Sequence, residues 1–328
     1  MINFDYIRPS TQKAAIDALN KDATSQLIAG GTNLVDLMKR GVTTPQKLID
    51  INNLPLRTIE EGKGIIRIGA LALNSEVAEN ELIVKKIPLL SLALKAGASP
   101  QIRNMATVGG NMMQRTRCPY FYDTVMPCNK RQPGSGCGAL KGYNRMHAIF
   151  GGTETCIAVH PSDMCIALAA LDATVVVSSP KGSRRIPFNE FHRLPGSAPQ
   201  KDNTLQRGEL ITAVEVPDNA AFVKNVLYNK IRDRASYAFA LVSVAAALDL
   251  KENIIQNARL AMGGVAHKPW RLTSAENFLK GKTASIAIFQ QAANMSMKDA
   301  KSYGYNKFKL TLAPNTIVET LKTITGLS

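Results

Sequence analysis

Apolar and polar residues along the first hundred positions follow patterns that predict short strands and helices in alternation. A mainly apolar run at 25–29 predicts a strand, and Gly30 and Gly31 predict a turn after it. Apolar residues at helical spacing over 34–38 then predict a helix that ends at Gly41. The same criteria predict strands at 47–51 and 64–70 and helices at 75–78 and 88–98. The first region is therefore mixed α and β.

The pattern breaks between residues 114 and 155, where proline, glycine, cysteine and arginine are frequent and no period is sustained. A connection of this length without secondary structure is uncommon inside a compact domain. We therefore expect something other than an apolar core to order this segment.

Regular patterns return after it. Residues 164–177 predict a helix that runs into a strand, whereas 195–208 has the composition of a linker or surface loop. Residues 226–250 predict a strand, a basic turn and a long run of small apolar residues, and 258–263 predict a further strand before helical segments that continue to the end. We place a domain boundary near residue 220.

The composition is that of a globular protein of 328 residues, with 45% hydrophobic and 20% charged residues, which is enough chain for two or three domain-sized units. No stretch approaches the roughly 18 uninterrupted apolar residues of a membrane helix, so we expect no membrane span. Asp5 stands where a signal peptide carries an apolar run, so we expect no export signal on this chain.

The formal net charge of +15 indicates an anionic partner, and its sign alone leaves nucleic acid, an acidic protein face and a phosphate-bearing cofactor open. Residues 101–150 stand out, because they hold seven lysines and arginines against Asp123 as the only acid. Few aromatic residues lie among the basic ones, and the chain has a single tryptophan. This supplies stacking platforms for single-stranded nucleic acid poorly, and we expect no nucleic-acid partner.

The first candidate binding loop is the turn after the predicted strand at 25–29. Backbone amides bind phosphate best where no side chain blocks the approach, which the paired glycines allow. The pattern is neither GxGxxG nor GxxxxGK[ST], and this disfavours a standard Rossmann site and a P-loop. A tight turn into a helix capped by Thr32 or Asn33 is the alternative. The loop consists of Ala29, Gly30, Gly31, Thr32, Asn33 and Leu34.

A second loop of the same character lies at residues 103–111. Its two glycines stand beside hydroxyl and amide side chains, which bond phosphate or the polar atoms of a flavin. Two such loops are able to clamp one diphosphate. The candidate residues in this loop are Ala106, Thr107, Gly109, Gly110 and Asn111.

Cys118, Cys128, Cys137 and Cys156 are separated by 9, 8 and 18 residues. Four thiolates from a loop rich in glycine and proline satisfy a cubane 4Fe-4S cluster, which takes one cysteine per iron. A structural zinc site and two disulfides are the alternatives. The lack of close CxxC pairs disfavours zinc, and the lack of a signal peptide disfavours disulfides. Cys165 falls within an apolar helical pattern and is predicted to be a packed residue.

Taken in order, these motifs resemble the flavin subunit of the xanthine dehydrogenase and aldehyde oxidoreductase family over essentially the whole chain. The resemblance rests on the two glycine loops, on Pro161-Ser162-Asp163 and on the run at 230–238, which reads KIRDRASYA. It implies that both loops wrap the diphosphate of an FAD, that Asp163 bonds the flavin side of the cofactor, and that Lys230 lies near the isoalloxazine. The alternatives are a helix-capping Asp163 and a surface-paired Lys230.

The resemblance also implies the fold. We expect an α+β (mixed α/β) protein, with a two-part FAD-binding domain of the PCMH type over 1–220 and a smaller α+β domain of the CO dehydrogenase flavoprotein type over 221–328. The second domain should combine an antiparallel sheet with helices. Neither glycine loop contains a cysteine or histidine, so the FAD is expected to bind noncovalently.

In most relatives the second glycine loop runs directly into the Pro-Ser-Asp segment, so residues 112–160 are an insertion. A subgroup that includes periplasmic aldehyde oxidoreductases and hydroxybenzoyl-CoA reductases has such an insertion with a 4Fe-4S cluster. Residues 115–123 and 128–131 are similar to those of the periplasmic aldehyde oxidoreductases. The resemblance thus implies a 4Fe-4S cluster on the four cysteines of the insertion. The basic residues that would offset its negative charge are Arg115, Arg117, Lys130 and Arg131, and an ordinary basic surface loop is the alternative.

The chain shows no Ser-His-Asp set, no paired catalytic carboxylates and no HExxH motif, and its four histidines are scattered. By resemblance it is an oxidoreductase subunit of a heterotrimer, in which a large subunit with molybdenum cofactor oxidises an aldehyde. A small subunit with 2Fe-2S clusters then carries the electrons, and FAD in this chain reduces an external acceptor. One rival interpretation is a self-sufficient FAD oxidase with its own small substrate, and another is a basic zinc or nucleic-acid-binding module.

The compartment follows from the cluster and the missing signal. A 4Fe-4S cluster is assembled where iron-sulfur machinery works, so the chain either stays in the cytoplasm or leaves folded with a partner that carries a twin-arginine signal. Resemblance to the periplasmic enzymes favours the periplasm. Fractionation of cells that coexpress the partners tests this, and a chain found only in the cytoplasm would refute it.

Overall fold

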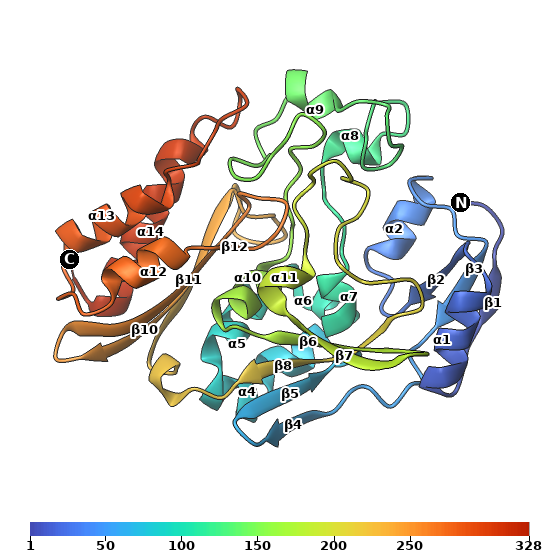
Figure 1. Ribbon diagram of the computed structural model, residues 1–328, viewed down its shortest axis with the longest axis horizontal. Coiled ribbons are helices and arrows are strands. Elements are labelled where there is room, and N and C mark those ends of the chain that lie inside the picture. The colour runs from blue at the N-terminus through green and yellow to red at the C-terminus, as the bar shows by residue number, and fades with distance from the viewer. Residues whose placement is uncertain (328) are drawn as a thin grey trace.

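Three β-sheets form the frame of the protein in the computed structural model, which describes residues 1–327 (Figure 1). The N-terminal sheet is parallel with the order β1-β3-β2, the central one is antiparallel with the order β4-β5-β8-β6-β7, and the C-terminal one is antiparallel with the order β12-β11-β10-β9. Helices cover the sheets, so the predicted α+β class with an antiparallel C-terminal sheet is confirmed. Among the described residues no helix has the length and apolar character that crossing a membrane requires.

The N-terminal unit contains the first glycine loop. Its strands and helices are β1 (Asp5–Ile7), α1 (Gln12–Lys21), β2 (Ser25–Ile28), α2 (Leu34–Lys39) and β3 (Lys47–Asp50). Ile16 of α1 and Ile49 of β3 pack together with Leu54 and Leu71 in a small apolar core. The predicted elements from 25 to 51 are confirmed, and they place the glycine loop between the end of β2 and the start of α2.

The central sheet is completed by a strand from far along the chain. Its strands are β4 (Ile59–Gly62), β5 (Ile65–Gly69), β6 (Thr174–Ser179), β7 (Gly182–Pro187) and β8 (Leu210–Pro217). β8 lies between β5 and β6, where nearly every one of its residues is buried. The first half of the domain is therefore joined to the part that follows the insertion.

Helices cover the inner face of the central sheet. They are α3 (Asn74–Glu79), α4 (Glu81–Lys86), α5 (Pro88–Ala96), α6 (Pro100–Arg103), α7 (Val108–Met112), α10 (Asp163–Ala170) and α11 (Phe188–Phe191). α10 is apolar on all sides, and every residue from Met164 to Ala170 is buried. This follows from its position, because it packs against the central core and also against β10 and β11 of the C-terminal sheet.

The C-terminal sheet is covered on both faces. Its elements are β9 (Asn225–Ile231), β10 (Val242–Lys251), β11 (Ile254–Gly263), β12 (Trp270–Arg271), α12 (Thr273–Leu279), α13 (Ile286–Ser296) and α14 (Lys309–Thr325), and a 3₁₀ turn at Ala220–Phe222 precedes them. Ala245 and Ala247 of β10 belong to the core around α10, whereas Val244 and Leu248 face the core beneath α12–α14. The long run of small apolar residues is thus a central strand buried on both faces.

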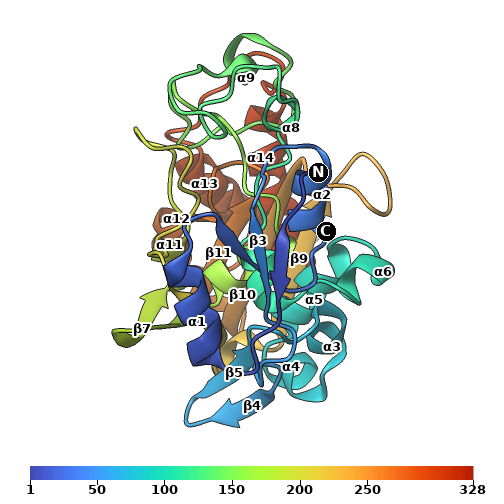
Figure 2. The same cartoon turned by 90° about the vertical axis from the view of Figure 1, so that its right-hand side faces the viewer.

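The segment from 114 to 155 contains only two short helices, α8 (Pro119–Tyr122) and α9 (Gly138–Lys141), so the predicted lack of sustained periodicity is confirmed. In Figures 1 and 2 this insertion lies at the top of the molecule, away from the central sheet. The apolar cluster there is small and centres on Phe121 and Cys128. The end of the segment packs in the C-terminal core at Ile149 and Phe150, whereas polar contacts attach the part before it.

The main polar attachment joins the insertion to the loop before β8. Lys130 is buried, and its ammonium donates to the carbonyl oxygen of Pro199 at 2.7 Å and pairs with Asp202. Arg115 Nε contacts the second carboxylate oxygen of Asp202 at 2.7 Å. The prediction of a surface loop at 195–208 is therefore incomplete, because this loop carries a largely buried anion that the insertion's cations require.

Replacing Asp202 by asparagine should lower the free energy of unfolding by about 3 kcal/mol, because it leaves the buried Lys130 without its counter-charge. Lys130 and Arg115 hold the pKa of Asp202 well below its usual range against the opposing effect of burial. The contribution is therefore complete above the unfolded-state pKa of about 4 and decreases as the pH falls below it.

Thermal or denaturant unfolding at pH 7 and at pH 3 measures both effects. Asp17→Asn is the control, because Asp17 forms an exposed helical pair with Lys13 that contributes little. Equal stability of Asp202→Asn and the parent protein at pH 7 would contradict this account of the attachment.

Candidate cofactor site

A large cavity of about 1710 Å³ lies where the N-terminal unit, the helices of the central layer and the start of the C-terminal sheet meet. All thirteen residues predicted to bind the cofactor line this one cavity, although they come from four separate parts of the sequence. They are Ala29, Gly30, Gly31, Thr32, Asn33, Leu34, Ala106, Thr107, Gly109, Gly110, Asn111, Asp163 and Lys230. The structure thus brings the predicted residues together.

The two glycine loops touch each other at Gly30. A Cβ atom at this position would lie 1.8 Å from the carbonyl oxygen of Met105, so only glycine fits there. In the second loop the Thr107 hydroxyl accepts the N–H of Gly110 at 3.2 Å and caps α7. The absence of a side chain at Gly30 therefore serves the contact between the loops as well as the approach of a ligand.

The side-chain amide of Asn33 uses its oxygen, but its nitrogen has no partner among residues 1–327. Its Oδ1 accepts the N–H of Arg115 at 2.8 Å, which connects the first loop to the start of the insertion. Its Nδ2 is buried and has no hydrogen-bond partner within residues 1–327. A buried donor without a partner costs free energy, so this atom suits an oxygen of a ligand in the cavity.

Asp163 and Lys230 form a buried pair between α10 and β9. Lys230 Nζ lies 2.8 Å from Asp163 Oδ2, and the Tyr228 hydroxyl donates to Asp163 Oδ1 at 2.7 Å. Burial raises the pKa of Asp163, and Lys230 opposes this effect. The capping side chain of α10 is Ser162, and Lys230 is buried, so neither a helix-capping Asp163 nor a surface-paired Lys230 describes the site.

The cavity is lined by twice as many basic as acidic side chains, which suits a ligand with a diphosphate. The basic ones are Arg40, Arg103, Arg115, Arg117, Arg145, Arg193, Lys201, Arg207, Lys230 and Arg234, and the acidic ones are Asp36, Asp163, Asp202, Glu209 and Asp233. Sequence reasoning missed the contribution of the loop at 200–209 and the start of β8, because their composition carries no binding motif. The glycine loops, the free amide and the basic lining together fit an FAD.

The four cysteines of the insertion line a second, much smaller cavity with Lys130 and Thr116. Cys128 and Cys137 are opposite each other in a short antiparallel bridge. Burial raises the pKa of Cys118 to about 12 and that of Cys156 to about 11, so these thiols keep their protons unless a cation binds. All five cysteines of the chain are free in the structure, and the four that converge offer the donor set of a 4Fe-4S cluster.

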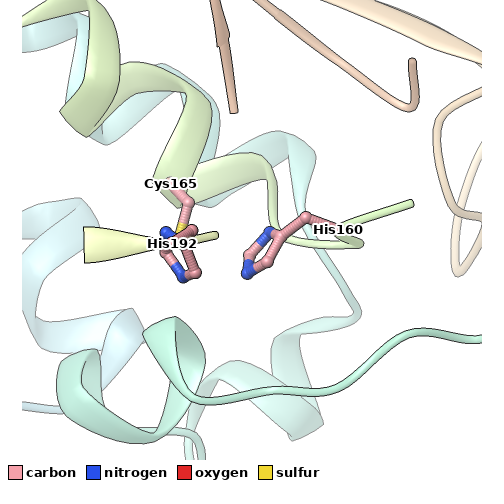
Figure 3. Close-up of side chains that lie close together, drawn as sticks. All are labelled: His160, Cys165 and His192. Carbon is pink, nitrogen blue, oxygen red and sulfur yellow. The ribbon is translucent and has the colours of Figure 1, made fainter. Parts of the chain in front are cut away.

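A different group of metal-ligating residue types includes Cys165 of α10. The ligand atoms of His160, Cys165 and His192 are within 4.8 Å of one another, and all three side chains are buried (Figure 3). His192 Nε2 donates to the carbonyl oxygen of Met112 at 2.9 Å, whereas His160 Nδ1 accepts the N–H of Ser162 at 3.3 Å.

These contacts decide how the group is interpreted. The proton of a neutral His160 is on Nε2, so His160 offers no free lone pair to a cation without losing its bond to Ser162. Burial lowers the pKa of both imidazoles, which are therefore neutral. Cys165 is fully buried on α10, as predicted for a packed residue. We interpret the group as packed polar core.

Two family models match the chain. One is described as the FAD binding domain in molybdopterin dehydrogenase and matches residues 2–219. The other is described as the CO dehydrogenase flavoprotein C-terminal domain and matches residues 227–324. Together they account for both the part that contains the glycine loops and the part that contains Lys230.

Among proteins of similar sequence is the FAD-binding subunit of the aldehyde oxidoreductase of Escherichia coli. It is 47% identical over 324 residues, which are 97% of each chain. The medium chain of glyceraldehyde dehydrogenase from Sulfolobus acidocaldarius is 29% identical over 89% of this chain and 86% of its own. A solved structure of carbon monoxide dehydrogenase from Hydrogenophaga pseudoflava contains a chain that shares the fold, with a TM-score of 0.78, 24% identity and coverage of 100% of this chain and 99% of that one.

Replacing Gly30 by alanine should weaken FAD binding by roughly tenfold or more, because the new Cβ forces the two loops apart at the carbonyl of Met105. FAD per chain, measured by absorbance after release from the protein, reports the loss. Gly41→Ala is the control: it adds a side chain at an exposed turn just after α2, where a new Cβ has nothing within 4 Å and only the local φ of 69° is strained. Full FAD occupancy in Gly30→Ala would show that the contact between the loops does not shape the site.

Proposed function

Because the chain belongs to the family of FAD-binding subunits of molybdopterin dehydrogenases, we propose that it is the electron-transfer flavin subunit of a molybdenum-dependent aldehyde oxidoreductase. The observation that carries the proposal is the cavity that gathers all predicted FAD residues in a chain 47% identical to an aldehyde oxidoreductase subunit. The relatives are subunits and medium chains, which favours this function over a self-sufficient FAD oxidase.

Bound FAD accepts electrons singly and delivers them singly or in pairs, which suits a relay between one-electron centres and a final acceptor. The residues of this chain supply binding and orientation. The glycine loops let backbone amides approach the diphosphate, and the surplus of basic side chains offsets its charge. Tyr228 and Lys230 hold the carboxylate of Asp163 in one orientation at the cavity wall.

We further propose that the insertion carries a 4Fe-4S cluster on Cys118, Cys128, Cys137 and Cys156. The support is their convergence on one cavity, where they offer four free thiols, one for each iron of a cubane. Lys130 is buried beside them and offsets negative charge at this place. The alternative is a zinc ion bound to the same four thiols, and measuring the iron and zinc content distinguishes it from a 4Fe-4S cluster.

The partners in this proposal are a large subunit with molybdenum cofactor and a small subunit with 2Fe-2S clusters, in a heterotrimer. The support is that relatives are named as one subunit of such enzymes and that this cavity holds no set of residues for activating an aldehyde. The basic insertion would face an acidic surface of a partner, since charge complementarity speeds and orients association.

Replacing Cys137 by alanine should reduce the iron content from about four atoms per chain to near zero, because a cubane needs one thiolate for each iron. Cys165→Ala is the matched control, since that cysteine is buried in α10 and away from the small cavity. Iron, zinc and FAD analysis of each purified variant gives the answer. The assignment fails if Cys165→Ala loses the iron while Cys156→Ala retains it, or if zinc replaces iron in the parent protein.

Purification of the chain from cells that coexpress its partners should yield three different polypeptides, and aldehyde should reduce the flavin only when all three are present. The reason is that electrons reach this chain from chemistry performed elsewhere. Stopped-flow absorbance of the flavin with and without the partners measures this. If the isolated chain oxidises aldehydes as fast as the complex does, the relay function is wrong and the self-sufficient oxidase takes its place.

A further inference from the structure

Lys309, the first residue of α14, is a buried cation that has no acidic partner among residues 1–327. Its side chain is fully buried, and its ammonium donates to the carbonyl oxygens of His147 at 3.0 Å and Gly264 at 2.6 Å. No carboxylate of residues 1–327 lies within 4.0 Å of it. Burial, together with the nearby charge of Arg145, lowers the pKa of Lys309 to about 7.

The other buried lysines near the two cavities each have an anion. Lys130 pairs with Asp202, and Lys230 pairs with Asp163. A buried ammonium that lacks a counter-charge costs several kcal/mol, and two carbonyl dipoles offset only part of this cost. The position of Lys309 is therefore explained best by an anion that is not one of the side chains.

The surroundings of Lys309 indicate where that anion lies. The residue that accepts its hydrogen bond, His147, also places its ring Nε2 3.1 Å from the sulfur of Cys118. The chain just before α14 is bound to the same stretch of the insertion, because Asn306 donates to the carbonyl oxygen of Ala148 at 2.9 Å and Asn144 donates to that of Tyr303 at 2.6 Å. This segment and the insertion lie side by side in Figure 1.

We propose that Lys309 is the buried counter-charge of the iron-sulfur cluster and that, with His147, it raises the reduction potential of the cluster. The inference rests on the proposed 4Fe-4S cluster. A cluster with four thiolates is anionic and gains one more negative charge on reduction, so a fixed cation nearby favours the reduced form. When Cys118 is a thiolate, His147 Nε2–H donates to its sulfur and acts in the same direction.

Arg145 is another cation close enough to act on Lys309, but it differs from Lys309 in exposure and pairing. It is partly exposed and forms a bidentate pair with Asp233 at 2.8 Å, so its charge is already compensated. Lys309 is thus a buried cation beside the insertion whose charge no carboxylate of residues 1–327 compensates, in contrast to Arg145 and Lys130.

The test is a redox titration of the purified protein, with its partners where they copurify, followed by the EPR signal of the reduced cluster. In Lys309→Met the midpoint potential should become more negative, so that the ratio of reduced to oxidised cluster at a fixed potential falls by roughly tenfold. This is the effect of one nearby unit charge at an effective dielectric constant of about 20. Lys307→Met is the matched control, because Lys307 is exposed two residues earlier. The flavin potential in the same samples is an internal reference.

The outcomes separate the inference from its premise. A parent protein without a cluster signal or iron overturns the proposed cluster itself. A cluster of unchanged potential in Lys309→Met overturns only the role of Lys309. If Lys309→Met lacks iron but retains FAD, Lys309→Arg decides: recovery of the cluster supports the counter-charge, and no recovery overturns it.

Discussion

The wall of the cofactor cavity depends on one buried ion pair, which Asp163 at the start of α10 makes with Lys230 on β9. α10 is packed within the central layer and β9 is a strand of the C-terminal sheet, so the pair links the two parts at the cavity. Buried ion pairs add little net stability compared with apolar residues of the same size, but losing one partner is costly. Their effect is to select one docking geometry, and Tyr228 restricts it further by bonding the second carboxylate oxygen.

Polar contacts of the same kind also attach the insertion, whose own apolar cluster is small and which packs on the C-terminal core only near its end, at Ile149 and Phe150. The carboxylate of Asp202 pairs with the side chains of Lys130 and Arg115. The side-chain oxygen of Asn33 accepts the backbone N–H of Arg115. Arg115 therefore connects the first glycine loop to the loop before β8 and to the insertion. These polar contacts are shared between the lining of the FAD cavity and the surroundings of the four cysteines, so the two cavities are held by the same residues.

Much of the site was predictable because its signals are local in sequence. Glycines before a helix predict an anion-binding turn, and four cysteines in an irregular segment predict a metal cluster. Both predictions need no knowledge of the tertiary structure. The sequence did not predict β8, because its neighbours β5 and β6 are distant in sequence. It did not predict the role of Asp202 either, because an acid in a polar loop becomes buried only through tertiary contacts such as the one with Lys130. Histidines that are scattered in sequence, such as His160 and His192, meet in space for the same reason.

Charge balance connects these observations. Lys130 and Lys230 carry their anions within the chain, whereas Lys309 and the surplus of basic residues around the large cavity do not. The basic residues around the large cavity repel one another and Lys309 is poorly solvated, so a bound diphosphate, and an anionic cluster if the proposed one is present, would relieve unfavourable electrostatics. Ligands that bind only the folded state stabilise it by mass action. Part of the net charge of +15 lies around the FAD cavity, so binding of the cofactor and stability of the fold are coupled.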